Sequence, residues 1–155
     1  MKFVKNIKLI TLVIFLYSCG YSSIYKNQNI INFKINIIET QGDQEMNNLI
    51  KNEIRLYSNK NSTKVYDIKI DTEYTKEILT RNASGVVTDY TLSVTSKFKI
   101  NLKEKTQTIK LTENIDIKNQ SDSFEQNTYE KNIKRSFASS IRDKLISKIS
   151  RINDN

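Results

Sequence analysis

The sequence has no histidine, no proline and no tryptophan, and its 155 residues include only three glycines and one cysteine. Without histidine there is no Ser–His or Cys–His pair for nucleophilic catalysis and no histidine-bound metal. Three glycines are too few to predict a loop that cradles phosphates, and a single cysteine cannot form an internal disulfide. We therefore expect no enzymatic activity, no cofactor and no metal site.

The one cysteine follows a segment with the layout of a secretory signal peptide. Residues 1–8 carry three lysines and no acid, and residues 9–17 are uncharged and mostly apolar. This run is too short for a membrane span, which needs about 20 apolar residues. A basic start, a short apolar run and a small residue at the cleavage point, here Ser18, indicate a signal peptide. We expect a signal peptide over residues 1–18, a tether over 19–30 and one domain over 31–155.

The residues around the cysteine also resemble a bacterial lipobox, Leu16-Tyr17-Ser18-Cys19. In that pattern the Cys19 thiol is acylated and the chain is cut before it. Each buried methylene contributes about 0.8 kcal/mol to membrane binding, so two acyl chains already anchor a protein stably. Gly20 stands where an aspartate would signal retention in the inner membrane, so the resemblance implies the periplasmic leaflet of the outer membrane. The alternative is an uncleaved anchor with an incidental cysteine.

The charge balance is basic, with 25 Lys and Arg against 17 Asp and Glu. Loss of residues 1–18 would lower the formal charge from +8 to +5. A basic protein can bind nucleic acid, but secretion removes this chain from nucleic acid, and we expect the anionic membrane as a partner instead. The carboxylate pairs Asp67 with Asp71 and Asp43 with Glu45 are more typical of a solvated surface than of a catalytic dyad.

Hydrophobic periodicity predicts four strands and two helices. Apolar and polar residues alternate over 30–38, over 64–79, from Val86 to 102 and between Ile109 and Ile117, which predicts strands. Spacings of three and four predict an amphipathic helix over 43–58, capped by Asp43. Ser123 with Gln126 matches a capping box at the start of a second, long helix. In the third strand, Ser96 is a polar exception on an apolar face.

The long helix carries an apolar stripe on one side and basic residues on the other. The stripe consists of Tyr129, Ile133, Phe137, Ile141, Leu145 and Ile149, and the basic residues are Lys131, Lys134, Arg142, Lys144 and Lys148. We expect the stripe to pack on a sheet and the basic face to be solvated; the alternative is a free helix on a membrane surface. The order β-α-β-β-β-α then predicts an α+β two-layer sandwich, with a four-stranded sheet covered on one face by two helices.

Several features of the chain occur together in one known family. They are Cys19-Gly20-Tyr21 followed by Ile24-Tyr25, the loop 80–85 leading into Asp89-Tyr90-Thr91-Leu92, the closing helix around 141–146, the element order and the length. Over nearly its whole length the chain thus resembles the LptE family of lipopolysaccharide (LPS)-assembly lipoproteins. The resemblance implies a protein that sits inside the β-barrel protein LptD, supports its assembly and binds LPS.

The resemblance also implies binding residues. Arg81 matches a basic position associated with LPS, and a guanidinium suits anionic phosphates. Lys76, a few residues before that loop, and Lys131 are further candidate LPS-binding residues, since positive charge favours the approach of a phosphorylated glycolipid. A second basic family position falls on Gln126, with Lys131 nearby, and the proline often found after the lipidated cysteine is Ser23 here. The runner-up is another outer-membrane lipoprotein that acts as a binding module for cell-wall or envelope-assembly machinery; a lipoprotein enzyme is a remote third.

Overall fold

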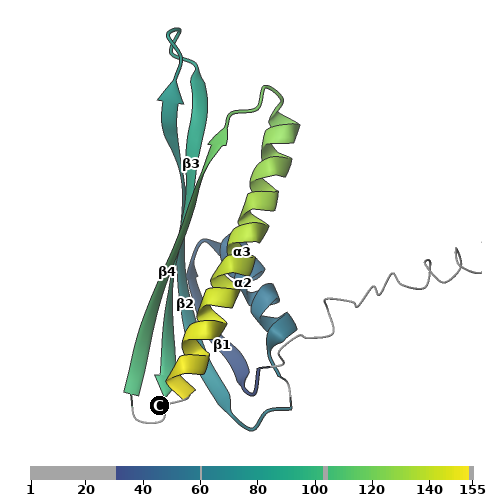
Figure 1. Cartoon of the computed structure of the whole chain (residues 1–155), viewed down its shortest axis with the longest axis vertical. Coiled ribbons are helices and arrows are strands. Elements are labelled where there is room, and N and C mark those ends of the chain that lie inside the picture. Colours follow the sequence, from purple (N-terminus) through teal and green to yellow (C-terminus); the bar gives the residue numbers. More distant parts are fainter. Residues whose placement is uncertain (1–30, 60, 103–104, 154–155) are drawn as a thin grey trace, which may run out of the picture.

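The structure is a computed structural model that describes residues 31–59, 61–102 and 105–153. The expected signal peptide, Cys19 and the tether to residue 30 lie outside the described residues, and they stay predictions. The described chain forms β1 (Lys34–Gly42), α2 (Gln44–Tyr57), β2 (Val65–Arg81), β3 (Val87–Leu102), β4 (Lys105–Lys118) and α3 (Ser123–Asn153). Both helices lie on one face of a four-stranded sheet (Figure 1), which confirms the predicted α+β sandwich.

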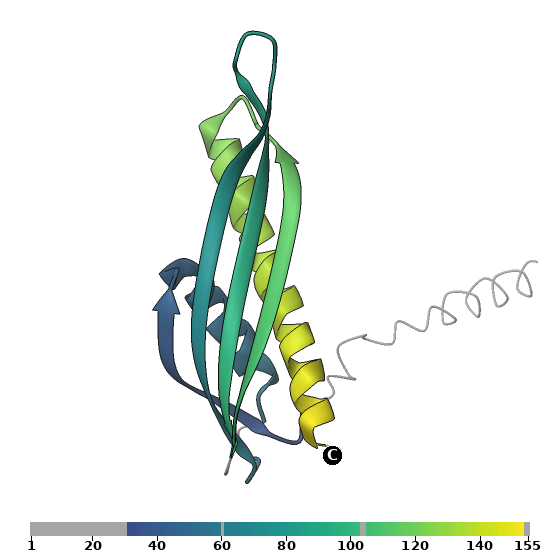
Figure 2. The ribbon, with the colours of Figure 1, turned by 90° about the vertical axis from the view of Figure 1, so that its left-hand side faces the viewer.

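The sheet order is β1-β2-β3-β4 (Figure 2). β2, β3 and β4 form the predicted antiparallel meander, and the β3–β4 register runs unbroken from Asp89 opposite Lys118 to Leu102 opposite Lys105. β1 pairs parallel to β2 and is joined to it through α2. Parallel neighbours need such a crossover, since a tight turn can only join antiparallel strands.

The first strand was predicted over 30–38, and this range is wrong by about four residues. β1 runs from Lys34 to Gly42, with a break in the register between Ile37 and Glu39. The bulge at Ile38 turns that side chain outward and lets pairing continue after the apolar alternation has ended. Phe33, before the strand, is nevertheless buried in the core.

The core lies between the sheet and the two helices. Its fully buried side chains include Met46, Ile50, Ile68, Ile70, Val94, Phe98, Ile100, Ile141, Leu145 and Ile149. Ser96 has a matching partner here, because Thr72 lies directly opposite in the register and the two hydroxyl oxygens are 3.0 Å apart. This pair satisfies two polar groups that would otherwise be buried at a cost of about 1–3 kcal/mol each.

Aspartates cap both helices. Asp43 accepts the Met46 N–H at 2.8 Å, as predicted. At α3 the predicted capping box is wrong by one residue: Asp122 accepts the Glu125 N–H at 2.8 Å, and Ser123 is the first helical residue. Gln126 uses its side chain differently, accepting the Gln120 N–H at 2.8 Å and donating to Glu130 at 2.6 Å.

α3 packs on the sheet through the predicted stripe, but only along part of its length. Phe137, Ile141, Leu145 and Ile149 are buried, Ile133 is partly buried, and Tyr129 is exposed. The first turns of α3 therefore extend beyond close contact with the core. Within the described residues, no helix is both long enough and apolar enough to cross a membrane.

Candidate functional site

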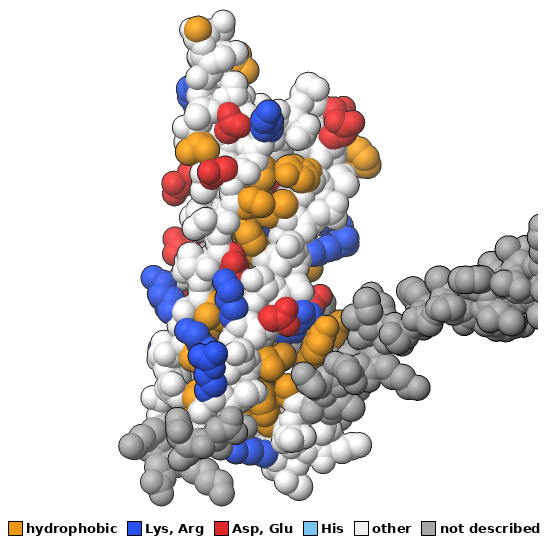
Figure 3. All heavy atoms as spheres, viewed as in Figure 1, with side chains coloured by type: hydrophobic (Ala, Val, Ile, Leu, Met, Phe, Trp, Pro, Cys, Tyr) orange, Lys and Arg blue, Asp and Glu red, His pale blue; other side chains and the backbone are white. Residues whose placement is uncertain are grey.

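The β2–β3 hairpin projects past the start of α3 (Figures 1 and 2). We call this part of the molecule, residues 76–91, 114–119 and 122–131, the hairpin end. Most of the large hydrophobic side chains that the described structure exposes lie here; they are Ile78, Leu79, Val86, Ile115, Phe124 and Tyr129. Val86 is 57% exposed and Phe124 76% exposed. In Figure 3, hydrophobic side chains gather over the upper sheet and the adjoining part of α3.

The hairpin tip is closed by Asn82. Its side-chain oxygen accepts the N–H groups of Ser84 at 3.0 Å and Val86 at 2.9 Å, and its carbonyl accepts the Gly85 N–H at 2.9 Å. Gly85 has φ +80° and no atom near the position of a Cβ. The turn is therefore held by local hydrogen bonds and does not depend on packing, so it can present its flanking side chains to a partner.

Arg81 lies in this tip and is exposed, as expected for a binding residue. Its Nη1 donates to the Gly85 carbonyl at 2.8 Å, and within the described residues it forms no ion pair. A guanidinium has five N–H donors, so those not used by Gly85 remain available to an anion.

Lys76 lies lower on β2, on the face that looks toward α3. It forms an ion pair with Glu130 of α3, and its Nζ is 4.2 Å from the centre of the Tyr90 ring. Burial alone would raise the pKa of Glu130, but hydrogen bonds from Lys76 and Gln126 hold that pKa below its usual value. Lys76 thus joins β2 to α3 with its charge already compensated.

Lys131 follows Glu130 on α3 and is exposed. The three predicted binding residues, Arg81, Lys76 and Lys131, share one end of the molecule, but in the described structure no hydrogen bond or ion pair joins any two of them. They do not form one preorganised cation cluster.

The charge around Arg81 is mixed. The acids of the hairpin end are Glu77, Asp89, Asp116, Asp122, Glu125 and Glu130, and its bases are Lys76, Arg81, Lys118 and Lys131. Hydrogen bonds from the Thr80 and Thr88 hydroxyls lower the pKa of Asp89, so it stays ionised. The basic excess lies elsewhere, along the second half of α3, where Arg142, Lys144, Lys148 and Arg151 outnumber the one acid, Asp143.

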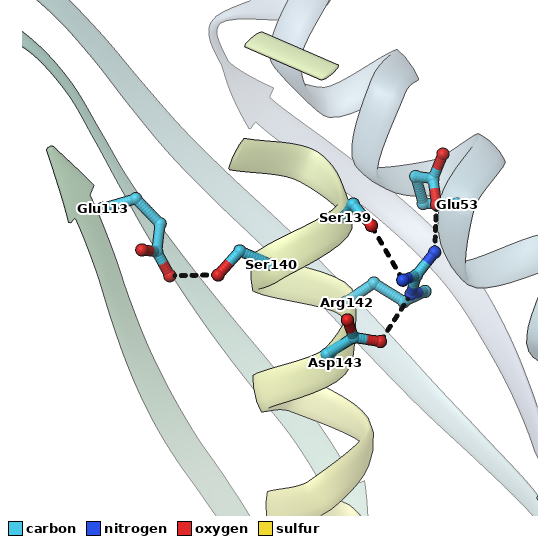
Figure 4. Close-up of polar contacts among 6 residues, drawn as sticks. All are labelled: Glu53, Glu113, Ser139, Ser140, Arg142 and Asp143. Atoms are coloured by element: carbon cyan, nitrogen blue, oxygen red, sulfur yellow. Dashed lines mark hydrogen bonds and ion pairs between the residues drawn. The ribbon is translucent and has the colours of Figure 1, made fainter. Parts of the chain in front are cut away.

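Two basic residues of α3 that were expected to be solvated have structural roles instead. Arg142 is only 7% exposed; it donates to Glu53 of α2, to Asp143 at 2.9 Å and to Ser139 at 2.8 Å (Figure 4). Its guanidinium carbon is 4.1 Å from the centre of the Tyr57 ring. The prediction of a fully solvated basic face is therefore wrong here, because α2 covers this side of α3.

Lys134 bridges the same two helices higher up. Its Nζ is 2.6 Å from Glu45 of α2 and 4.4 Å from the centre of the Tyr74 ring. Burial, together with Glu130, Glu45 and Asp43, raises the pKa of Tyr74 to about 12. The raised pKa keeps the Tyr74 hydroxyl neutral, and this hydroxyl has no hydrogen-bond partner among the described residues.

Sequence reasoning identified Arg81 but missed the apolar side chains beside it. The signal was present in Leu79 and Val86, which flank the polar loop 80–85 on both sides where a solvated hairpin would carry polar residues. Within the described part of the chain, no group of three or more acidic or cysteine side chains could hold a metal.

No protein family and no curated protein sequence matches the chain. Its fold resembles rare lipoprotein B from Shewanella oneidensis, with 14% identity, coverage of 77% of this chain and 98% of that one, and a TM-score of 0.59. A candidate lipoprotein from Caulobacter crescentus CB15 is 8% identical over 82% and 94%, with a TM-score of 0.60. Lipoprotein B from Nitrosomonas europaea is 13% identical over 80% and 88%, with a TM-score of 0.53. The likeness is one of fold, and these structural neighbours are lipoproteins.

Proposed function

We propose that this chain is an outer-membrane lipoprotein of the LptE type, anchored through Cys19. In this proposal its hairpin end docks into an LptD-like β-barrel, supports the barrel's assembly and assists the transport of LPS to the cell surface. The chain performs no catalysis in this role. The observation that carries the proposal is the exposed apolar surface of the hairpin end, because exposed hydrophobic side chains concentrated in one region mark a surface that a partner covers.

The placement of this surface fits a docking role. β1 begins opposite the start of β2, whereas the hairpin follows the end of β2, so the anchored side and the hairpin lie at opposite ends of the domain. A strand of 17 residues, the length of β2, spans roughly 55 Å. An extended tether of 11 residues, from Gly20 to residue 30, adds at most about 40 Å. The hairpin can therefore reach a partner well away from its own anchor.

The fold supports the same assignment. The β-α-β-β-β-α order that carried the family resemblance is the order of the structure, and its structural neighbours are lipoproteins. The proposed LPS contact rests on Arg81, whose remaining N–H groups face solvent. The mixed charge of the hairpin end favours a specific contact there over general attraction of anions.

The test is co-purification from detergent-solubilised outer membrane. Wild type should retain a large β-barrel protein, whereas Leu79→Asp combined with Val86→Asp should lose it, because both changes place charge in the apolar surface. Leu56→Asp is the matched control: Leu56 is 68% exposed on α2, away from the hairpin, and this variant should retain the barrel. Retention by the hairpin variant, or co-purification of cell-wall machinery in place of a barrel, would favour the alternative binding module.

A second arm separates anchoring from docking. Cys19→Ala should abolish labelling by a fatty-acid analogue, since the thiol is the acyl acceptor, yet a folded Cys19→Ala chain should still bind the barrel. Unchanged labelling of Cys19→Ala would contradict the lipoprotein assignment. If Cys19→Ala lost both the label and the barrel, the acyl chains would be the part of the protein that contacts the barrel.

A further inference from the structure

β4 is an outer strand of the sheet, and its free edge is long and regular. It has 14 residues and pairs with β3 along its whole length without a bulge. In Figure 2 no other described element continues the sheet beyond β4. An uncovered edge of this length offers a row of main-chain donors and acceptors that another strand can pair with.

The register shows which residues offer these groups. The Asn119 N–H donates to the Thr88 carbonyl at 2.8 Å, and this pair continues the β3–β4 register. Successive residues of a strand direct their main-chain groups to opposite edges. Odd-numbered residues of β4 therefore bond to β3, and even-numbered ones face the free edge; these are Thr106, Thr108, Lys110, Thr112, Asn114, Asp116 and Lys118. The same alternation holds in β2, where the carbonyls of Lys64 and Thr72 both accept from the β1 side.

The other outer strand is protected. β1 has only 9 residues and carries a bulge. On its outer side, Ser58 Oγ accepts the Ile35 N–H at 2.9 Å, and the Asn59 N–H donates to the Phe33 carbonyl at 3.3 Å. Bulges and covering loops are the usual means of blocking an edge. The β4 edge has neither of these among the described residues.

Cations line this edge on both sides. A shallow depression runs between β4 and the second half of α3, and its lining includes Lys110, Lys148 and Arg151. All three are exposed, and none forms an ion pair with a described residue. Lys144, beside them, is paired with Glu113 at 2.5 Å, and the carboxylate of Asp143 is used by Arg142. Lys110 faces the uncovered side of the sheet, whereas Lys148 and Arg151 lie on the helix side.

We propose that the free edge of β4 binds an acidic, extended polypeptide segment of a partner protein as a fifth strand. Main-chain hydrogen bonds to the even-numbered residues would supply affinity, and the cations on both sides would select acidic side chains. A second copy of this chain is a poor occupant, since it would set two basic edges against each other. The chain's own segment 20–30 is also unsuited, because it contains Lys26 and no acid. The stretch of this edge from Thr106 to Thr112, which the cations flank, lies outside the hairpin end.

The test uses the full chain in detergent and three fluorescent nine-residue peptides. The first alternates valine and glutamate, the second replaces each glutamate by lysine, and the third is the acidic peptide with alternate main-chain amides methylated. The acidic peptide should bind at least about tenfold more tightly than either control, because only it offers both carboxylates and free N–H groups. On binding, the amides of Thr108, Lys110, Thr112 and Asn114 should become protected from hydrogen exchange.

Two variants locate the contact. Lys148→Glu with Arg151→Glu should weaken binding of the acidic peptide about tenfold or more, whereas Arg135→Glu, at an exposed position on the first half of α3, should change it less than about twofold. Thr112→Pro removes one outward N–H without touching the β3 ladder, as edge strands tolerate, and should also weaken binding about tenfold. No binding by the acidic peptide, or equal binding by the methylated or the basic peptide, would overturn the proposal without requiring any variant to fold.

Discussion

Arg81 combines an exposed position with a local hydrogen bond that orients it. The hydrogen bond from Nη1 to the Gly85 carbonyl orients the guanidinium, and its other N–H groups remain available to a ligand. We predict that Arg81→Glu weakens binding of labelled LPS at fixed ionic strength by about 1–3 kcal/mol, the worth of a charge-assisted contact. The melting temperature and barrel association should not change. Lys131→Glu is the control, and an equal loss of LPS affinity in that variant would mean that diffuse electrostatic attraction is responsible. Unchanged LPS affinity in Arg81→Glu would show that Arg81 is not part of the binding site.

Gly42 ends β1 at a place where no side chain fits. Its φ is +80°, and a Cβ would lie 2.0 Å from the Thr72 carbonyl oxygen, the acceptor of the Asp43 N–H. We predict that Gly42→Ala lowers the free energy of unfolding by about 3 kcal/mol or more, from left-handed strain and the clash together. Gly85→Ala has the same φ but open space, so it should cost only about 1 kcal/mol. Equal urea midpoints for the two variants would contradict this.

Tyr74 makes stability depend on pH in alkaline solution. The folded state raises the pKa of Tyr74 to about 12, against about 10 in an unfolded chain, so the folded state binds more protons between these values. Its contribution to stability is complete below pH 10 and is lost as pH rises through 12. Tyr74→Phe should remove this loss and, because the hydroxyl is unpaired, should not destabilise the protein at pH 7.

Urea unfolding at pH 9 and pH 11 measures this effect. The stability of Tyr74→Phe relative to wild type should increase by on the order of 1 kcal/mol between the two pH values. Tyr129→Phe, at an exposed tyrosine, controls for general tyrosine effects. Parallel pH profiles for wild type and Tyr74→Phe would show that burial of Tyr74 has no such consequence.

At the scale of elements, Arg142 ties α3 to α2. Its removal leaves Glu53 without its partner and uncovers the face of Tyr57. We predict that Arg142→Ala lowers the free energy of unfolding by about 2 kcal/mol, since a mostly buried ion pair loses one member and its packing. Lys148→Ala, an exposed residue of the same helix, should stay within about 0.5 kcal/mol of wild type. Similar denaturation curves for both variants would place Arg142 on the solvated surface.

The elements themselves followed from the sequence because their periodicity is local. Alternation gave β2, β3 and β4, and Asp43 correctly marked the start of α2. The cap of α3 was ambiguous locally, because the adjacent residues Asp122 and Ser123 can both cap a helix and Asp122 takes the role. Two other details depended on non-local contacts. The bulge at Ile38 lets β1 continue its pairing with β2 past the apolar alternation. The parallel direction of β1 leaves no trace in its own side chains, because it is decided by the crossover through α2.

The candidate site was only partly predictable for a similar reason. Arg81 could be placed at an exposed turn, since polar residues surround it in the chain, although the structure makes it the last residue of β2 and pairs it with Val87. The pairing of Lys76 with Glu130 joins residues far apart in sequence, and the burial of Arg142 depends on how α2 lies across α3. No periodicity within one element reports either contact.

At the scale of the whole molecule, two surfaces differ in their chemistry. The hairpin end is apolar with mixed charge, and the β4 edge is basic with free main-chain groups. The start of the domain, on the side of the proposed Cys19 anchor, lies opposite the hairpin. A lipoprotein organised in this way can be held at a membrane through one end while its other end enters a partner, which leaves the sheet edge accessible from the side.

Site-specific photocrosslinking in living cells tests the central claim most directly. A photoreactive amino acid replaces Val86 at the hairpin tip or, as the control, Leu56 on α2; both positions are exposed in the free protein. We predict that the probe at 86 crosslinks to a large outer-membrane β-barrel protein of the LptD type and that the probe at 56 does not. A barrel crosslink from 56 alone, or no barrel crosslink from 86, would contradict the account.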